Sequence, residues 1–329
     1  MSNLRCDSVF FLFNLIPKKG NVKYVYTTLV YIDTLLSGTI RVMKERKKVN
    51  LTKNIILKTT IKDAFAHIFK RNFMFVSPQT HCTTVMMFLY PAVMCYIDGI
   101  VVIKDNKPVG RIGGKNMLGY IIKNGFKKFQ KSVAADLIEH DEYIAETKTV
   151  EDLLTIIKNT KFSFVPIVDK DEHVITTISI RDFLPLVAAL DLPIPSISIA
   201  NKLLVVSDQL TVKNALSIML DNKIRRLGIE KKDDEVPSID DKIISVHNND
   251  GNISIIDDRI ILEHICFNIN DPRCLNTKLE KLARENSVRI TSQLTIPETA
   301  ELLSGKERCC ALPNNHIVTP WDIVIKALA

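Results

Sequence analysis

The sequence has no Cys-x-x-Cys pair and no cluster of cysteines and histidines at the spacing of a zinc site. An odd number of cysteines, seven, indicates a reducing compartment, and we expect the cytoplasm. They are Cys6, Cys82, Cys95, Cys266, Cys274, Cys309 and Cys310. Cys309 and Cys310 lie in an apolar, strand-like stretch, where buried thiols act as small hydrophobic side chains. The sequence therefore predicts no metal site.

Catalytic signatures are also absent. The chain contains no phosphate-binding Gly-x-x-x-x-Gly-Lys-Ser/Thr loop, no His-Glu-x-x-His helix and no Gly-x-Ser-x-Gly nucleophile turn. The scattered His67, His81, His140 and His316 show no metal-ligand spacing, and we interpret the single Trp321 as packing at a helix start. We therefore expect neither an enzyme nor a catalytic cofactor.

No apolar stretch has the length of a membrane span, which is about twenty residues. Ser8–Ile16 is too short, Tyr24–Ile40 carries Asp33 in its middle, and Thr83–Ile97 contains Pro91. The first of these also lacks the cleavage site of a secretory signal. We expect no transmembrane segment, and residues 1–48 are given no function.

Composition indicates a folded protein of about two domains. Of the 329 residues, 46% are hydrophobic and 25% are charged, as in soluble globular proteins. The formal net charge of +7 permits anionic partners without requiring them. The basic run at 44–48 is short and interrupted, so we interpret it as a solvated connector. Nucleic acid is a possible partner that the sequence does not favour.

A pattern of four helix starts repeats along the chain. In each, a threonine precedes an aliphatic residue, and mostly apolar residues follow that residue at positions three, four and seven. This pattern predicts N-capped amphipathic helices. The four sets are Thr60 with Ile61, Ala64, Phe65 and Ile68; Thr149 with Val150, Leu153, Leu154 and Ile157; Thr211 with Val212, Ala215, Leu216 and Met219; and Thr295 with Ile296, Thr299, Ala300 and Leu303.

Each helix start is followed by a predicted hairpin and a second helix. The hairpins are expected at 164–178, 310–318, 100–112 and, around a polar loop from Lys231 to Asn252, at 226–256. The second helices start at Ser179-Ile180-Arg181-Asp182, which has the form of a capping box, at Thr319-Pro320-Trp321-Asp322, near Lys115 and near Ile260. The sequence thus predicts an α/β fold of four strand-helix-strand-strand-helix units.

These motifs resemble the CBS domain. The resemblance rests on Thr149-Val150, Val165-Pro166-Ile167-Val168, Ser179-x-x-Asp182 and Thr319-Pro320-Trp321-Asp322. Boundaries follow from it: an unassigned segment at 1–48, a first repeat at 49–125 that residues Gln79 to Asp98 interrupt, and further repeats at 126–192, 196–270 and 275–329. The resemblance implies pairing of the first repeat with the second and of the third with the fourth into two Bateman modules, joined at Pro193-Ile194-Pro195.

The resemblance also implies an adenosyl ligand between paired repeats, held through its ribose hydroxyls by the aspartate of the Ser/Thr-x-x-Asp motif. A carboxylate can accept both vicinal hydroxyls, and the adjacent helix start favours phosphate. On this mapping the ligand-binding residues are Ser179, Asp182, Arg181, Ile144, Val165 and Pro166 in one module and Thr319, Asp322, Ile290, Leu312 and Pro313 in the other. The same capping box also starts a helix when no ligand binds there.

The first and third repeats depart from this motif. Gly113 and Asn116 stand at the motif positions of the first repeat, so Asn116 is a weaker candidate. In the third, we place Ile256 and Arg259 at these positions, which removes the carboxylate. Arg225 and Arg226 are further weak candidates for a phosphate that reaches across from the fourth repeat.

The resulting hypothesis is a regulatory protein that binds AMP, ADP, ATP or S-adenosylmethionine and signals to an effector protein, with a homodimer as the expected assembly. The alternative is a scaffold, or a nucleic-acid-binding protein, in which the repeats bind no small molecule.

Overall fold

The computed structural model describes residues 52–94, 99–139, 142–230, 254–282, 288–305 and 307–328. The expected loop from Lys231 to Asn252 and the apolar stretches at 8–16 and 24–40 lie outside these residues.

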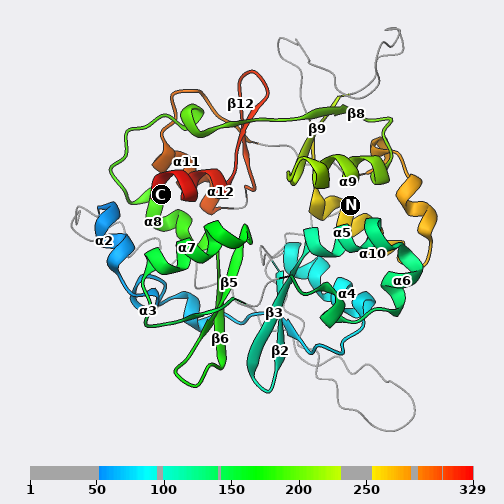
Figure 1. Cartoon of the computed structure of the whole chain (residues 1–329). Coiled ribbons are helices and arrows are strands. Elements are labelled where there is room, and N and C mark those ends of the chain that lie inside the picture. Colours follow the sequence, from blue (N-terminus) through cyan, green and yellow to red (C-terminus); the bar gives the residue numbers. More distant parts are fainter. Residues whose placement is uncertain are drawn as a thin grey trace, which may run out of the picture. The chain divides into compact units, whose positions relative to one another are not determined.

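Four small sheets organise the described residues, each with two flanking helices or helical segments (Figure 1). The first unit comprises β1 (Phe75–Val76), α4 (Cys82–Met94), β2 (Gly99–Lys104), β3 (Lys107–Gly113) and α5 (Gly114–Asn124). The second comprises β4 (Ile144–Ala145), α7 (Val150–Thr160), β5 (Phe164–Val168), β6 (Val174–Ser179), η3 (Ile180–Phe183) and α8 (Leu184–Ala188).

The third unit comprises β8 (Val205–Ser207), α9 (Val212–Asp221), β9 (Arg226–Glu230), β10 (Ser254–Asp257) and α10 (Asp258–Phe267). The fourth comprises β11 (Val288–Arg289), α11 (Ile296–Ser304), β12 (Cys310–Leu312), β13 (His316–Val318) and α12 (Pro320–Leu328). The connecting segments contain α2 (Lys53–Lys58), α3 (Ile61–Ala64), η1 (Ile68–Lys70), α6 (Phe126–Lys131), η2 (Ala134–Leu137), η4 (Ser196–Ile199), β7 (Asn201–Lys202), η5 (Pro272–Asn276) and η6 (Leu279–Lys281).

All four sheets share one topology. The first strand pairs parallel with the second, because a helix crosses over between them, and the second pairs antiparallel with the third through a hairpin. Strand β7 adds an edge to the fourth sheet by pairing with β13. The predicted mixed α/β fold and its hairpins are therefore confirmed.

The first unit corrects the sequence analysis. Residues 79–98, expected as an interruption, contain α4, which is the crossover helix between β1 and β2. The helix expected after Thr60 is the four-residue α3, whose start bridges Thr149 in the second unit. The repeated helix-start pattern did not predict α4, because this helix is apolar almost all round and contains Pro91. In the described part of the chain, no helix combines the length and hydrophobicity that a membrane span needs.

Connecting segments cross between neighbouring units. The residue at the start of each crossover helix forms an isolated bridge with a connecting segment from outside its own unit. The four bridges are Thr60 with Thr149, His81 with Val133, Pro195 with Thr295, and Thr211 with Lys278. These bridges couple the first unit with the second and the third with the fourth.

The sheets of each coupled pair also touch. Between the first two units, Val101 packs with Phe162 and Phe164, and the buried Arg111 donates to the Phe164 carbonyl at 2.6 Å. Between the other two, Ile255 packs in a cluster with Cys309.

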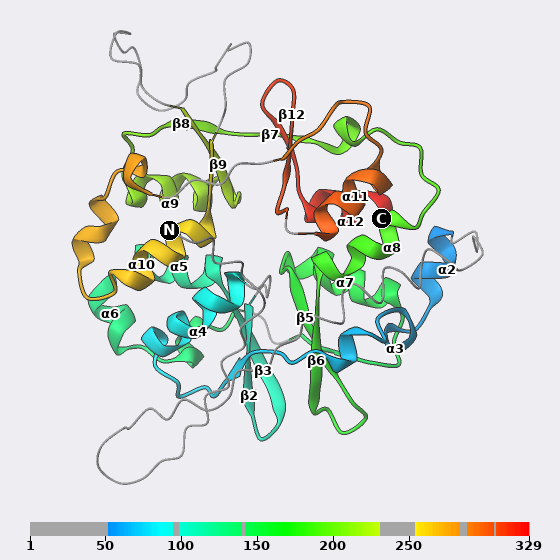
Figure 2. The same cartoon turned by 180° about the vertical axis from the view of Figure 1, so that it is seen from behind.

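Helices pair the first unit with the third and the second with the fourth. One buried core joins α4 and α5 of the first unit to α9 and α10 of the third, and a second joins α7 and α8 to α11 and α12. Figures 1 and 2 show these two groups of helices in both views. Each unit therefore contacts one neighbour through its sheet and another through its helices.

Candidate functional site

The first predicted ribose clamp, Ser179 with Asp182, forms a capping box at the start of η3. The Ser179 amide donates to Asp182 Oδ2 at 2.7 Å. The same carboxylate forms a two-pronged ion pair with Arg71, at 2.8 Å and 2.9 Å, and Arg71 also donates to the Thr177 carbonyl at 2.9 Å. Only 9% of the Asp182 side chain is exposed. Both oxygens of this carboxylate are therefore engaged within the protein.

Arg181, the expected phosphate contact, points to a different place. Its Nη2 donates to the carbonyl oxygens of Leu303 at 2.8 Å and of Gly305 and Glu307 at 3.1 Å. These carbonyls lie at or just beyond the end of α11, where helix carbonyls lack partners within the helix. Arg181 thus ties the second unit to the fourth.

The residues expected to hold the base lie mostly in the interior. Ile144, Val165, Ile290 and Leu312 belong to the core shared by the second and fourth units. Pro166 is buried on β5, whereas Pro313 is exposed in the turn between β12 and β13. Of this set, the structure exposes only Pro313.

The second predicted clamp, Thr319 with Asp322, starts α12. The Thr319 amide and hydroxyl both donate to Asp322 Oδ2, at 2.9 Å and 2.7 Å. The other oxygen, Oδ1, accepts from the amide of the exposed Asn201 at 2.7 Å. Burial raises the pKa of the Asp322 carboxyl, although its hydrogen bonds with Thr319 and the charge of Arg226 oppose the shift. This carboxylate is therefore costly to ionise and has a neutral partner.

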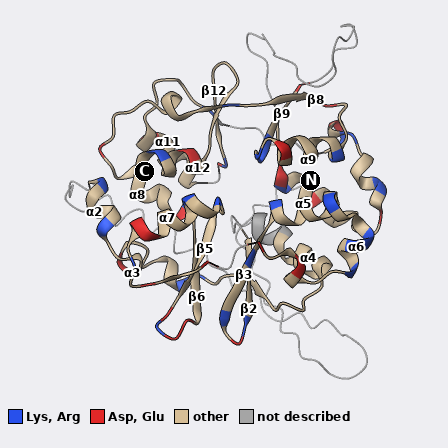
Figure 3. Cartoon of the chain, viewed as in Figure 1, with Lys and Arg blue, Asp and Glu red and all other residues tan. Residues whose placement is uncertain are grey.

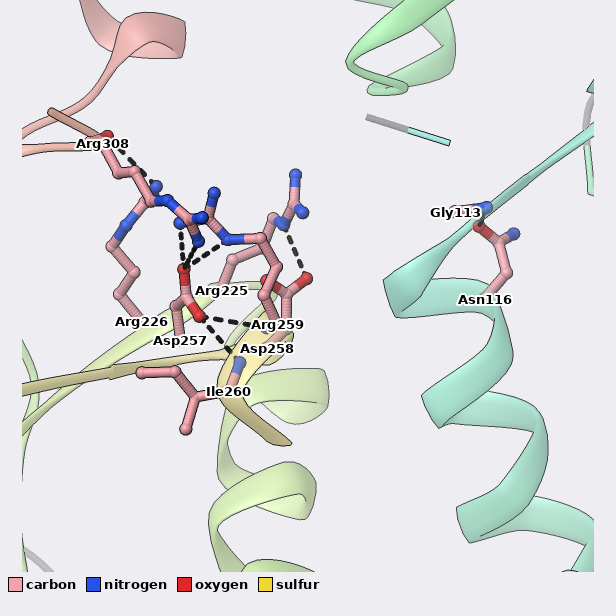
Figure 4. Close-up of polar contacts among 9 residues, drawn as sticks. All are labelled: Gly113, Asn116, Arg225, Arg226, Asp257, Asp258, Arg259, Ile260 and Arg308. Carbon is pink, nitrogen blue, oxygen red and sulfur yellow. Dashed lines mark hydrogen bonds and ion pairs between the residues drawn. The ribbon is translucent and has the colours of Figure 1, made fainter. Parts of the chain in front are cut away.

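The third unit holds a cluster of arginines around two aspartates (Figure 4). Asp257, with 1% of its side chain exposed, caps α10 by accepting from the Arg259 and Ile260 amides at 3.1 Å and 3.0 Å. It also pairs with the Arg259 guanidinium, and Arg308 lies 3.9 Å away. Burial disfavours the charge of Asp257, but the neighbouring Arg259 and Arg226 hold its pKa below the ordinary value.

This geometry corrects the motif positions of the third unit. The cap is Asp257 and not Ile256, and the residue three positions later is Ile260 and not Arg259. The reason is that β10 extends one residue further than expected, with Asp257 paired to Arg226 in register. A carboxylate is present at the cap, but none stands at the ribose position.

The two weaker arginine candidates have separate partners. Arg225 pairs with Asp258 at 2.7 Å, at the start of α10. Arg226 donates through Nη2 to the Arg308 carbonyl at 3.2 Å and so links the third unit to the fourth. Its Nε is buried without a hydrogen-bond partner among the described residues. Figure 3 shows acidic and basic positions side by side where β9 meets α10.

In the first unit, Asn116 takes the place of the clamp aspartate. Its Oδ1 accepts from the Gly113 amide at 3.1 Å, which completes the cap of α5. Its Nδ2 is buried without a hydrogen-bond partner in the described part of the chain. Figure 4 shows Gly113 and Asn116 apart from the arginine cluster.

A group of possible metal ligands lies in the turn between β5 and β6. Ligand atoms of Asp169, Asp171 and His173 come within 4.8 Å of one another. Asp169 Oδ1, however, accepts from the backbone amides of Asp171 and His173, both at 2.9 Å. The carboxylate thus already serves to hold the turn.

Comparison with protein families identifies the second unit. Residues 134–189 match the model of the CBS domain. This segment is a CBS domain. It contains Ser179 and Asp182 as well as the Thr149 cap of its crossover helix, while Arg71 lies outside it. A search of the curated proteins finds no match.

Solved structures show the same fold over a larger part of the chain. Protein MJ1225 from Methanocaldococcus jannaschii, proposed as an archaeal homologue of g-AMPK, is 16% identical with a TM-score of 0.61, covering 78% of this chain and 96% of its own. The CBS-pair protein CBSX2 from Arabidopsis thaliana is 21% identical with a TM-score of 0.34, covering 39% and 94%. A CBSX2 structure in complex with AMP is 23% identical with a TM-score of 0.30, covering 35% and 87%. With TM-scores below 0.5, the last two add nothing to the fold that MJ1225 shows.

Sequence reasoning missed the partners of the clamp aspartates. Arg71 lies 111 positions before Asp182, and Asn201 lies 121 positions before Asp322. No local pattern connects residues so far apart, and both lie in segments that precede a sheet unit. Asp257 carried a local signal, since an aspartate directly before an apolar helix is a common cap.

Proposed function

We propose that this chain is a regulatory protein that binds an adenosine nucleotide, or a related adenosyl compound, between the third and fourth units. Thr319 and Asp322 would hold the ribose, and Arg226 would meet the phosphate. The observation that carries this proposal is the position of Arg226, which belongs to the third unit and donates to the Arg308 carbonyl of the fourth at 3.2 Å. Its charge also opposes the raised pKa of Asp322.

The chemistry of this pair suits such a ligand. A carboxylate can accept the two vicinal hydroxyls of a ribose, and among the described residues Asp322 Oδ1 would have to give up only the bond from the exposed Asn201 amide. The guanidinium of Arg226 offers donors and a positive charge for phosphate. The amide and hydroxyl of Thr319 orient this carboxylate through its other oxygen, Oδ2.

Regulation would follow from the shared surfaces of the units. A ligand between the third and fourth units would bias their relative arrangement, and the helical cores would carry this bias to the other two. Coupling free energies of this kind are typically about 1–3 kcal/mol. We propose that a separate effector protein receives this signal. We also propose that the chain forms a homodimer, has a non-catalytic role and works in a reducing compartment.

Isothermal titration with AMP, ADP, ATP and S-adenosylmethionine tests the ligand and its site. We expect saturable binding that Asp322→Ala weakens by about 10- to 100-fold, because a hydrogen bond to a charged group contributes about 1.5–3 kcal/mol. Asp152→Ala is the matched control, since it removes a capping-box aspartate from α7 in the second unit. Equal weakening in both variants would mean that Asp322 acts through stability alone.

A scaffold that binds no small molecule is the second candidate. It is favoured by the engaged state of both clamp carboxylates, one by Arg71 and one by Asn201. The absence of heat with all four compounds would support it. Binding to DNA or RNA that falls steeply with salt would instead support a role with nucleic acid.

A further inference from the structure

We infer that Arg71 blocks ligand binding at Asp182, so that adenosyl binding is confined to Asp322. This inference rests on the proposed function and assigns to Arg71 the role of a specificity-determining residue. It explains how two similar capping boxes in one chain can differ in ligand binding.

The guanidinium occupies the atoms that a ribose would need. Arg71 Nη1 donates to Asp182 Oδ1 at 2.8 Å, and Nη2 donates to Oδ2 at 2.9 Å. Oδ2 also accepts from the Ser179 amide. A ribose held by this carboxylate would have to present its two hydroxyls to the same two oxygens, so it competes directly with Arg71.

Arg71 is also held in position before any ligand arrives. It follows η1, and its backbone amide donates to the Ile68 carbonyl at 2.9 Å. The Thr176 hydroxyl donates to that same carbonyl at 3.3 Å, which fastens η1 to β6. The bond from Arg71 to the Thr177 carbonyl aligns the guanidinium further. The guanidinium is thus preorganised beside Asp182, and its displacement would break several contacts at once.

The two clamps differ in the strength of the competitor. At Asp182 the competitor is a charged guanidinium in two-pronged geometry beside a carboxylate that is 9% exposed. Such charge-assisted bonds are about twice as strong as neutral ones. At Asp322 the competitor is the neutral amide of the exposed Asn201. A ribose can therefore replace Asn201 far more easily than it can replace Arg71.

Removal of the Arg71 guanidinium should create a second binding position. Arg71→Met keeps the bulk of the side chain and removes the charge, and titration with AMP in the Asp322→Ala background isolates the Asp182 position. We expect Asp322→Ala to bind AMP about 10- to 100-fold more weakly than wild type, Asp322→Ala/Arg71→Met to bind it at least tenfold more tightly than Asp322→Ala, and this gain to be lost when Asp182→Ala is added. Arg71→Lys keeps the charge and should leave the position closed.

Circular dichroism and thermal melting establish that each variant is folded, and Arg71→Gln provides a second neutral replacement should the Met variant unfold. If the Arg71→Met and Arg71→Gln variants are folded and gain no binding at Asp182, the inference that Arg71 blocks this position is wrong. Weaker AMP binding after Arg71→Met alone would also overturn it, because Arg71 would then be a ligand contact. If wild type binds nothing and Arg71→Met binds through Asp182, the blocking role of Arg71 is supported and the proposed site at Asp322 is wrong. If wild type binds through Asp322 and Arg71→Met adds no binding, the site at Asp322 is supported and the blocking role is wrong.

Discussion

Asp182, Asp257 and Asp322 all lie in the first turn or at the cap of a helix, and each accepts hydrogen bonds from nearby backbone amides. Their remaining partners differ. Arg71 neutralises Asp182 and Arg259 neutralises Asp257, whereas Asp322 has the neutral Asn201. Asp322 is partly buried and has no ion pair among the described residues, so its ionised form carries a free-energy cost that the nearby charge of Arg226 only partly offsets.

This cost should depend on pH. The raised pKa of Asp322 means that the folded state binds a proton more tightly than the unfolded chain, so the ionised carboxylate lowers stability as pH rises above about 3.9. Asp322→Asn removes this cost. We expect the variant to gain stability relative to wild type between pH 4 and pH 7, as measured by urea denaturation at both values.

Asp152 provides a control of opposite sign. Hydrogen bonds from the backbone and side chain of Thr149 lower its pKa, so its ionised form contributes stability that is present at neutral pH and lost as pH falls through the folded pKa. Asp152→Asn should therefore lose stability relative to wild type over the same pH interval. Parallel pH trends in the two variants would contradict the assignment of Asp322.

At the scale of elements, α4 shows how a helix can be central to a unit without an amphipathic pattern. Val85, Met86 and Leu89 are fully buried in the core that the first and third units share. Met87, by contrast, is 64% exposed. The neighbouring methionines therefore report on opposite faces of one helix.

Substitution of these two methionines tests the position of α4. Met86→Ala should lower the free energy of unfolding by about 2–5 kcal/mol, because it leaves a cavity in a packed core. Met87→Ala should change it by less than about 0.5 kcal/mol. Urea denaturation measures both, and equal effects would mean that residues 82–94 do not pack as the crossover helix of the first unit.

At the scale of the whole described molecule, the two helical cores each combine residues from both halves of the sequence. One core includes Leu118 and Leu216, and the other includes Leu153 and Leu303. The sheets pair the first unit with the second and the third with the fourth, but the helices pair the first with the third and the second with the fourth. Neither half can bury its helices without the other.

Separation of the halves at Pro193 tests this arrangement. A fragment that ends at Leu192 and one that begins at Pro193 should each expose apolar helix faces, bind a hydrophobic dye and self-associate. Mixed in equal amounts, they should form a complex that unfolds in one cooperative transition, as followed by circular dichroism and size-exclusion chromatography. Two halves that are separately monomeric and cooperatively folded would contradict the shared cores.

Much of the local structure could be predicted from the sequence, because caps and turns join residues only a few positions apart. The Thr149, Thr211 and Thr295 hydroxyls accept from the amides three residues later, as the pattern indicates. The helix starts at Ser179 and Thr319 followed from local chemistry in the same way.

The tertiary structure alone decided the rest. The same helix-start pattern at Thr60 produces only the short α3, because that segment packs against the second unit, and α4 carried no comparable signal. The partners of Asp182 and Asp322 come from more than 100 positions away. Periodicity and capping describe interactions within a few residues, whereas long-range packing chooses which side chains meet. The sequence by itself thus determined the repeated units and their carboxylates, and the fold decided that one carboxylate faces an arginine and the other a neutral amide.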